Sequence, residues 1–212
     1  MADLASSSLI DFTEALASDA PAPGGGSASA AAGAAGAALL AMVVRLTVGK
    51  EKYKAVWDEL TPLSDRLEEA RKRLLELVDE DTDAYDGIVA ARRLPKTTDQ
   101  EKSIRLKAID DATMLATTTP MQTAFFAQLA LTVAPVIAEK GNPNASSDAF
   151  VAALLLSTAV EGALANVRIN LPGVSDRDLA RGFREDADDL EKKCHAAVRA
   201  VREIGRARTL AS

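Results

Sequence analysis

The run from Ser27 to Val44 contains 18 consecutive residues without a charge, most of them alanine, glycine or serine. Alanine favours helix, and Gly33 and Gly36 suit a helix that other helices approach closely. The length is near the minimum for a membrane span, but alanine and glycine give only a weak drive to insert into lipid. We therefore expect a helix packed inside a protein and no membrane partner.

The segment before this helix combines rigid and permissive residues. Pro21 and Pro23 restrict the backbone, whereas Gly24, Gly25 and Gly26 free it again. Ser27 is expected to cap the helix, and free N–H groups at a helix start bind anions. Two interpretations remain open. The segment is either a flexible turn or a loop that a ligand or another backbone approaches closely.

Helical periodicity dominates the rest of the chain, and no turn separates alternating β-branched runs. Pro62 is expected to kink or split the longest helix. A regular apolar seam in the last helix suits packing or dimer formation. The pattern predicts an all-α, elongated antiparallel bundle without a sheet, forming one domain over 1–212. The expected helices cover 7–17, 27–48, 51–93, 99–116, 120–140, 146–170 and the chain from 175 onward.

Composition narrows the function classes. The net charge is −6 with no basic tract, which argues against a nucleic-acid partner. One cysteine and one histidine exclude an internal disulfide and a Cys/His zinc site, so no metal is expected. The start from Met1 to Leu4 lacks the basic and apolar regions of a signal peptide, which predicts a cytoplasmic protein.

Asp81 breaks the heptad pattern of the longest helix. One heptad position reads Leu60, Leu67, Leu74, Asp81 and Ile88. If the helix bends away here, Asp81 is solvated. If it does not, the carboxylate must be paired, must reach a cavity, or must have a raised pKa.

Other candidate residues lie near helix ends. Asp148, Asn166 and Asn170 share one face of a predicted helix, but Asp148 and Asn166 are about 27 Å apart along its axis. We expect a symmetric dimer to bring such ends together; the alternative is that the asparagines cap helix ends. Lys96 follows a helix end on a rigid turn, and Lys50 belongs to a small basic patch.

Cys194 and His195 are adjacent on a helix, so they do not face each other and are expected to be structural.

Together these segments resemble the cyclodeaminase/cyclohydrolase family of folate enzymes. That family comprises the C-terminal half of formiminotransferase-cyclodeaminase and stand-alone methenyltetrahydrofolate cyclohydrolases. The matching stretches occur in order along almost the whole chain, which makes them far more specific together than singly. They are Pro21–Ser27, Leu46–Lys50 with Lys52–Tyr53, Asp81–Tyr85, Leu94–Lys96, Gly141–Asn144 with Ser147–Asp148, and Asn166–Asn170.

The resemblance implies a helical homodimer that acts on a tetrahydrofolate derivative without a metal or other cofactor. Because no formiminotransferase domain is attached, a methenyltetrahydrofolate cyclohydrolase is the better match. The alternatives are a formimidoyltetrahydrofolate cyclodeaminase that releases ammonia, and a non-catalytic helical dimer that binds folate or a protein. On this resemblance we expect Asp81 or Asp148 to act as the catalytic base. Lys96 is expected to donate a proton or to bind the glutamate carboxylate of the substrate. The residues expected to bind substrate are Gly24, Gly25, Gly26, Ser27, Lys50, Asn144, Asn166 and Asn170.

Overall fold

The computed structural model describes residues 3–210. Met1 and Ala2, which belong to the start that predicted a cytoplasmic protein, lie outside the described residues. Across 3–210 the chain forms α-helices and short 3-10 helices, with no strand. The predicted all-α class is therefore confirmed.

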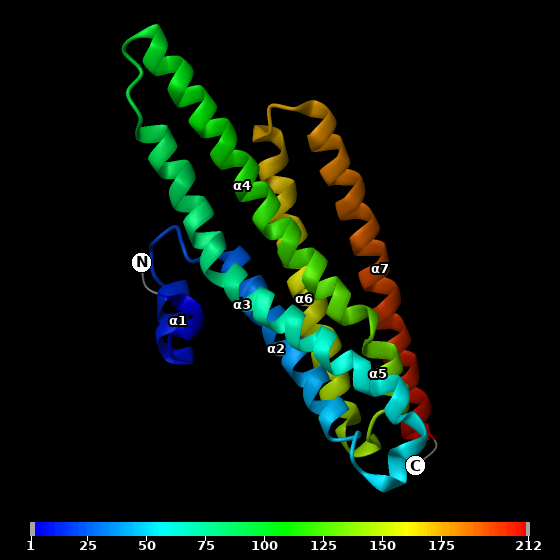
Figure 1. The fold of residues 1–212 in the computed structure, drawn as a ribbon. Helices are drawn as coiled ribbons and strands as arrows, with labels where there is room; N and C mark the ends of the chain where they lie inside the picture. Colours follow the sequence, from blue (N-terminus) through cyan, green and yellow to red (C-terminus); the bar gives the residue numbers. More distant parts are fainter. Residues whose placement is uncertain (1–2, 211–212) are drawn as a thin grey trace.

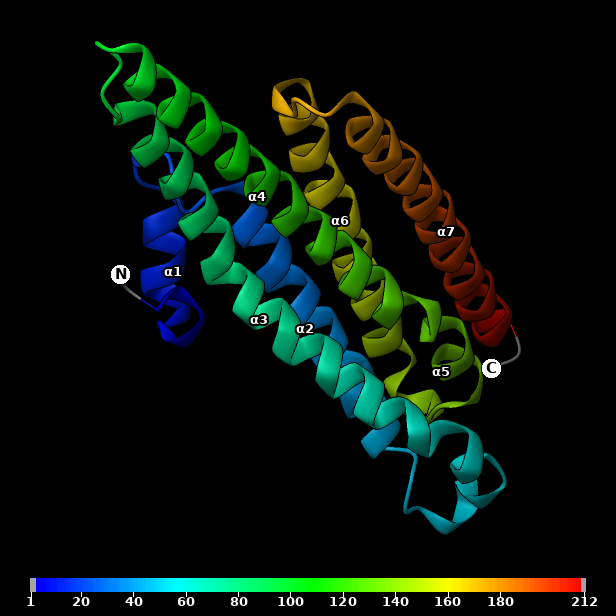
Figure 2. The ribbon, with the colours of Figure 1, turned by 45° about the horizontal axis from the view of Figure 1, so that its top comes forward.

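Five long helices form an elongated bundle in which consecutive helices run in opposite directions (Figures 1 and 2). The hairpin of α3 and α4 extends past the other helices at one end (Figure 1). Helix α7 packs against α6 and α4. The long helices are α2 (Gly25–Arg45), α3 (Trp57–Arg93), α4 (Asp99–Thr132), α6 (Ser146–Asn170) and α7 (Arg177–Leu210).

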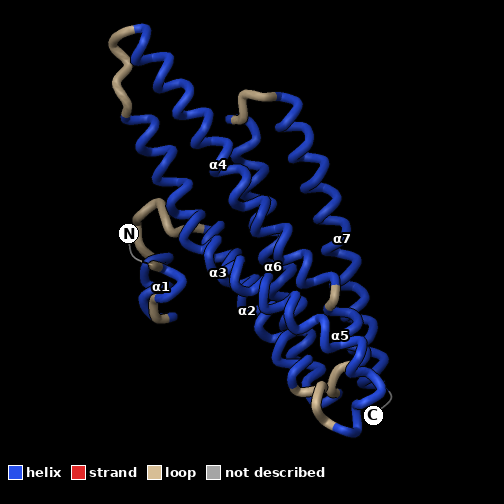
Figure 3. The backbone as a smooth tube through the Cα atoms, in the orientation of Figure 1, coloured by secondary structure: helices blue, strands red, loops and turns tan. Residues whose placement is uncertain are grey.

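Short helices and loops connect the long helices at the ends of the bundle, and the N-terminal segment lies along its side (Figure 3). The 3-10 helix η1 (Leu4–Ser6) packs on α3 and precedes the short helix α1 (Leu9–Leu16). The backbone N–H of Leu4 donates to Asp79 Oδ1 at 2.7 Å. Asp79 therefore anchors the N-terminal segment to α3. The remaining short elements are η2 (Glu51–Val56), α5 (Ala134–Lys140), η3 (Pro143–Ala145) and η4 (Leu171–Gly173).

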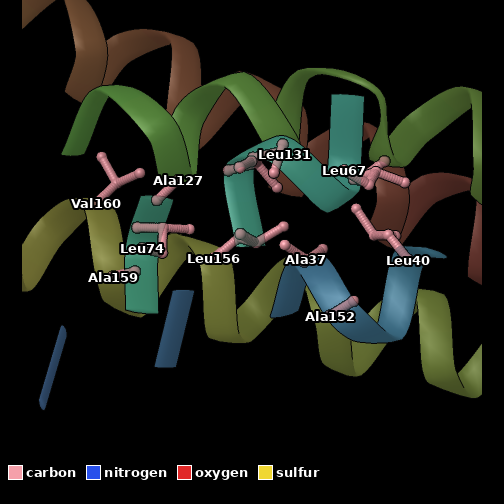
Figure 4. Packing of buried hydrophobic residues seen from close by; sticks show 14 of the residues in the cluster. Ala37, Leu40, Leu67, Leu74, Ala127, Leu131, Ala152, Leu156, Ala159 and Val160 are labelled. Atoms are coloured by element: carbon pink, nitrogen blue, oxygen red, sulfur yellow. The ribbon is translucent and has the colours of Figure 1, made fainter. Parts of the chain in front are cut away.

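The core follows the predicted heptad stripe of α3. Leu60, Leu67 and Leu74 are fully buried, and so is Leu77 on the second heptad position. These leucines pack against small residues of α2, α4 and α6, such as Ala37 (Figure 4). Alanines fill most of the remaining core, which is why the helices can lie close together.

Glycines set the spacing between α2 and α6. A Cβ added at Gly36 would lie 2.7 Å from Leu156 Cγ and 2.9 Å from the Ala152 carbonyl oxygen. A Cβ added at Gly33 would lie 3.1 Å from Ala159 Cβ. The expected close helix approach is confirmed, and of Gly33 and Gly36 it is Gly36 that leaves less room for a side chain.

The apolar seam of α7 is used within the chain. Ala187, Cys194 and Val201 are buried in the main core, and Leu190 packs against it. The seam is thus already occupied, so it does not serve dimer formation. Cys194 is buried, as expected for a structural residue.

The predicted break near Pro120 is wrong, because α4 continues through this proline to Thr132. A proline has no N–H, so Pro120 leaves the Ala116 carbonyl without its helical partner. The side-chain amide of Asn170 donates to that carbonyl at 2.7 Å and replaces the lost bond. The helix ends instead at Thr132, with Val133 as its C-cap, immediately before the Ala134–Pro135 start of α5.

Pro62 likewise lies inside α3 without splitting it. It is exposed, as is Asp58, whose carbonyl loses its partner, so water can satisfy that group. The predicted helix from residue 51 is divided elsewhere, between η2 and α3 at Val56.

By length and composition, three segments are long and apolar enough to cross a membrane: Gly25–Arg45, Asp99–Lys140 and Pro143–Gly173. In the bundle these segments pack on one another and on α3 and α7.

We predict that Gly36→Ala lowers the free energy of unfolding by about 1–3 kcal/mol, because the added methyl group meets backbone and a packed leucine. Urea unfolding followed by circular dichroism measures the change. Gly87→Ala in α3 is the control, since a Cβ at Gly87 meets nothing within 4 Å. It should raise stability by about 0.5–1 kcal/mol. Equal effects of the two variants would contradict the packing argument.

Candidate functional site

A cleft of about 260 Å³ opens where the start of α2 meets α3, α4 and α6. Its lining combines the proline–glycine loop, one carboxylate, two side-chain amides and a few apolar groups. The loop supplies Pro21, Ala22, Gly24, Gly25 and Gly26; the helices supply Asp81, Ala84, Tyr85, Ile88, Ala116, Asn166, Ile169 and Asn170.

Asp81 is half-buried and lies against the start of α2. Its Oδ2 accepts a hydrogen bond from the Ser27 backbone N–H at 2.9 Å and one from the Ser27 hydroxyl at 3.2 Å. The Ser27 hydroxyl also lies 3.3 Å from Thr82 Oγ1. Of the two outcomes open from the sequence, pairing beside a cavity is the one observed.

The carboxylate replaces a missing helix cap. The N-cap residue of α2 is Gly24, which has no side chain, and Ser27 is the third residue of the helix. The expected capping role of Ser27 is therefore wrong. An N-cap side chain normally accepts from the second or third N–H of a helix, and Asp81 does this from a neighbouring helix. The positive end of the helix dipole also favours the negative charge.

Gly26 makes this contact possible. A Cβ added at Gly26 would overlap the Asp81 carboxylate. The glycine-rich loop is therefore approached closely by a side chain of the same chain. The anion at the start of α2 is Asp81 itself, which leaves its other oxygen, Oδ1, beside the cleft.

Burial raises the pKa of Asp81 above its ordinary value of 3.8, and the hydrogen bonds from Ser27 only partly offset this effect. Removing a carboxylate from water disfavours its charged form. Asp81 is also the only acidic or basic side chain among the described cleft-lining residues. The cleft therefore carries a single, poorly solvated negative charge.

Asn166 and Asn170 lie one turn apart on α6 and face the same cleft. The Nδ2 of Asn166 donates to the Gly162 carbonyl at 2.9 Å, and that of Asn170 donates to the Ala116 carbonyl at 2.7 Å. In each side chain one N–H of the amide donates to a protein carbonyl. Within residues 3–210, no donor reaches either Oδ1, so both amides can offer an acceptor to a ligand.

The structure places the predicted residues in three groups. Asp81, Gly24, Gly25, Gly26, Asn166 and Asn170 meet at the cleft. Ser27 is fully buried, so it can reach a ligand only through Asp81. The third group lies away from the cleft within one chain and comprises Lys96, Lys50, Asn144 and Asp148.

The members of this third group are separated from the cleft by helix length. Lys96 is exposed in the α3–α4 loop, beyond the end of α3 at Arg93, which is about 18 Å along the axis from Asp81. Lys50 follows the opposite end of α2 from Gly26. Asn144 and Asp148 lie at the start of α6, and the Asn144 N–H donates to Asn142. Their proposed roles stay predictions.

Sequence reasoning missed several residues of the cleft. Tyr85 follows Asp81 by four positions, so helical spacing alone could have placed it on the same face. Ile169 is 76% exposed beside the cleft and breaks no sequence pattern. Ala116 comes from α4 and carries no signal in the sequence, because its role depends on a distant asparagine.

The cleft offers a charge, two acceptors and exposed apolar surface in one place. Such a site can hold a flat cationic ligand, and Asp81 can hydrogen-bond or deprotonate a water molecule next to it. Among residues 3–210, no group of three His, Cys, Asp or Glu side chains is arranged to hold a metal ion.

Comparison with known proteins gives the family. The family model described as formiminotransferase-cyclodeaminase matches residues 8–189. The chain belongs to this family. The resemblance inferred from the sequence motifs is thereby confirmed.

Three relatives show how the family varies in length. A methenyltetrahydrofolate cyclohydrolase of Methylorubrum extorquens is 37% identical over 195 residues, which cover 89% of this chain and 94% of that protein. A formimidoyltransferase-cyclodeaminase of Rattus norvegicus is 34% identical over 92% of this chain, but the match covers 36% of that protein. The crystal structure of a formiminotetrahydrofolate cyclodeaminase from Thermotoga maritima matches with a TM-score of 0.84 at 27% identity. That match covers 94% of this chain and 96% of the other.

We predict that the free energy of unfolding of Asp81→Asn, relative to that of the wild type, increases as pH rises. Because the folded pKa of Asp81 is raised, the folded state binds more protons than the unfolded state between pH 3.8 and that raised value. Wild-type stability from this group therefore falls as pH rises through the window. Asparagine keeps an acceptor for the Ser27 N–H but does not ionise. Urea unfolding of both proteins at several pH values measures the difference, and a difference independent of pH would contradict the burial effect.

Proposed function

We propose that this chain is a methenyltetrahydrofolate cyclohydrolase, which hydrolyses 5,10-methenyltetrahydrofolate to 10-formyltetrahydrofolate. The observation that carries the proposal is the half-buried Asp81 carboxylate, held by Ser27 in a cleft with no other charged lining residue. The similarity to the Methylorubrum cyclohydrolase, which extends over nearly the full length of both proteins, supports the same reaction.

The reaction needs a negative charge beside the bridge. The methenyl carbon joins N5 and N10 as an amidinium cation. Water adds to this carbon and loses one proton. The hydroxyl of the adduct then loses a second proton to form the formyl carbonyl, while the C–N5 bond breaks and N5 takes up a proton. One proton is released overall. A desolvated carboxylate stabilises the cation and can accept the proton of the attacking water.

The two asparagines match the pterin ring. The pterin has N–H donors at its 2-amino group, N3 and N8. The Oδ1 atoms of Asn166 and Asn170 are acceptors without a donor among the described residues. The loop from Gly24 to Gly26 leaves room for the ring to approach the backbone, and Tyr85 and Ile169 offer apolar surface beside it.

The cleft holds only part of such a substrate. Its volume of about 260 Å³ is below the ~300 Å³ at which pockets begin to enclose a drug-sized ligand. The aminobenzoyl-glutamate portion would therefore extend outside. Lys96 and Lys50 are proposed to bind its carboxylates, and Lys96 is also a candidate proton donor.

A homodimer belongs to the same proposal. Asp148 and Asn144 lie at the opposite end of α6 from Asn166, so they can reach a cleft only from a second subunit. Large side chains that line the cleft remain exposed, including Tyr85 at 37% and Ile169 at 76%. A second copy packed near the cleft would cover them.

The remaining expectations stand as proposals too. We infer a cytoplasmic protein that binds neither membrane nor nucleic acid and needs no cofactor beyond its folate substrate. The packing of the three apolar segments on other helices of the bundle supports a water-soluble form.

We keep two alternative functions for the same cleft. A formimidoyltetrahydrofolate cyclodeaminase forms the same methenyl bridge while ammonia leaves, and the Thermotoga and rat relatives bear names of this kind. A non-catalytic folate- or protein-binding dimer would use the cleft without turnover.

We expect purified protein to remove the absorbance of the methenyl chromophore at near-neutral pH faster than the uncatalysed reaction does. Parallel incubation with 5-formiminotetrahydrofolate should release little ammonia. Ammonia release as the faster reaction would favour the cyclodeaminase. Absence of both activities, with folate still bound, would favour the binding protein.

We further expect Asp81→Asn or Asp148→Asn to reduce kcat by at least ~100-fold, the usual contribution of a positioned acid–base group. The wild-type rate should also fall below a pH set by the raised pKa of Asp81, because the protonated carboxyl can neither stabilise the cation nor accept a proton. Steady-state rates over a pH series measure both effects. Normal activity in both variants would refute the assignment.

Mixing the two inactive variants tests whether two subunits share a site. In a random mixture of dimers, one site of each mixed dimer has both aspartates intact, so about a quarter of wild-type activity should return. No recovery, together with activity lost only in Asp81→Asn, would place the whole site in one chain.

A further inference from the structure

Pro120 creates an acceptor at the base of the cleft. It is buried inside the continuous helix α4, where every ordinary residue would donate its N–H to the carbonyl four residues earlier. Proline lacks this N–H, so the Ala116 carbonyl is left for another donor. Ala116 is itself part of the cleft lining.

Asn170 supplies that donor from α6. Its Nδ2 lies 2.7 Å from the Ala116 carbonyl oxygen. A carbonyl can only accept, so the NH₂ end of the carboxamide must face α4. The Oδ1 end is then fixed on the other side. Within the described residues it receives no hydrogen bond, which leaves it available to a ligand.

A comparison inside the chain shows that this arrangement is not a general consequence of proline. Pro62 also lies inside a helix, but it is exposed, and no side chain among residues 3–210 donates to the Asp58 carbonyl that it frees. Only at Pro120 is the freed carbonyl bound by a side chain of the cleft.

We propose that Pro120 is a positioning residue for substrate. The N–H missing at this position orients the Asn170 carboxamide so that it presents an acceptor, and not a donor, to the pterin N–H groups. With an ordinary residue at 120, the helix backbone would occupy the Ala116 carbonyl, and the carboxamide could rotate and present either end. The inference rests on the proposed function, because it takes the pterin as the ligand of Asn170.

The test is a double-mutant cycle with Pro120→Ala, Asn170→Ala and the double variant, assayed with methenyltetrahydrofolate. Pro120→Ala should raise KM about tenfold, the value of one well-made hydrogen bond, and change kcat less than twofold. The double variant should have the same KM as Asn170→Ala, since both changes remove one interaction. Pro120→Ser restores the same N–H with a different side chain and should give the same shift in KM.

Pro62→Ala is the matched control. It also restores an N–H inside a helix, and it should leave KM unchanged. A readout independent of activity is the exchange of the Asn170 side-chain amide protons with solvent, observed by NMR. This exchange should be slow in the wild type and in Pro62→Ala, and fast in Pro120→Ala.

Each outcome decides a different claim. Unchanged KM in both Pro120 variants, additive KM effects in the double variant, or an Asn170 amide that stays protected in Pro120→Ala would overturn the positioning role. Those results would leave the cyclohydrolase assignment intact. Failure of the proposed function would appear separately, as a wild-type protein without cyclohydrolase activity. The NMR measurement would still report whether Pro120 orients Asn170.

Discussion

The hydrogen bonds between Asp81 and Ser27 at the start of α2 determine where the cleft carries its negative charge. They fix a carboxylate from α3 at an uncapped helix start, and they require a glycine at position 26 to make room. The carboxylate gains the N–H groups and dipole of α2 but loses water, and the loss of water outweighs the gain, which raises its pKa. A destabilised charge of this kind is suited to act on a cation.

Close packing of α2 on α6 makes the second half of the site possible. Gly33 and Gly36 let the two helices approach, and this brings the far end of α6 next to the glycine loop. Asn166 and Asn170 then face the same cleft as Asp81. The same small residues that give the bundle an alanine-rich core therefore also bring the loop, the carboxylate and the amides together.

The sequence indicated that Asp81 has an unusual environment, because a charge at a heptad position conflicts with burial and needs a partner elsewhere in the fold. The sequence wrongly predicted that Ser27 caps α2 and that a helix breaks at Pro120. In both cases a residue from another helix replaces the expected local hydrogen bond: Asp81 caps α2, and Asn170 binds the Ala116 carbonyl. Capping and breaking rules describe a helix by itself, so they fail where a neighbouring helix supplies the partner.

The sequence alone determined the helical class, the buried stripe of α3, the close approach at Gly33 and Gly36 and the family. These depend on periodicity, residue size and ordered motifs, which are properties of neighbouring positions along the chain. Only the tertiary structure decided that six of the predicted residues share a cleft while Lys50, Lys96, Asn144 and Asp148 lie elsewhere in the chain. Proximity between helices depends on their register and packing, and a periodic pattern does not specify how far one helix is shifted along another.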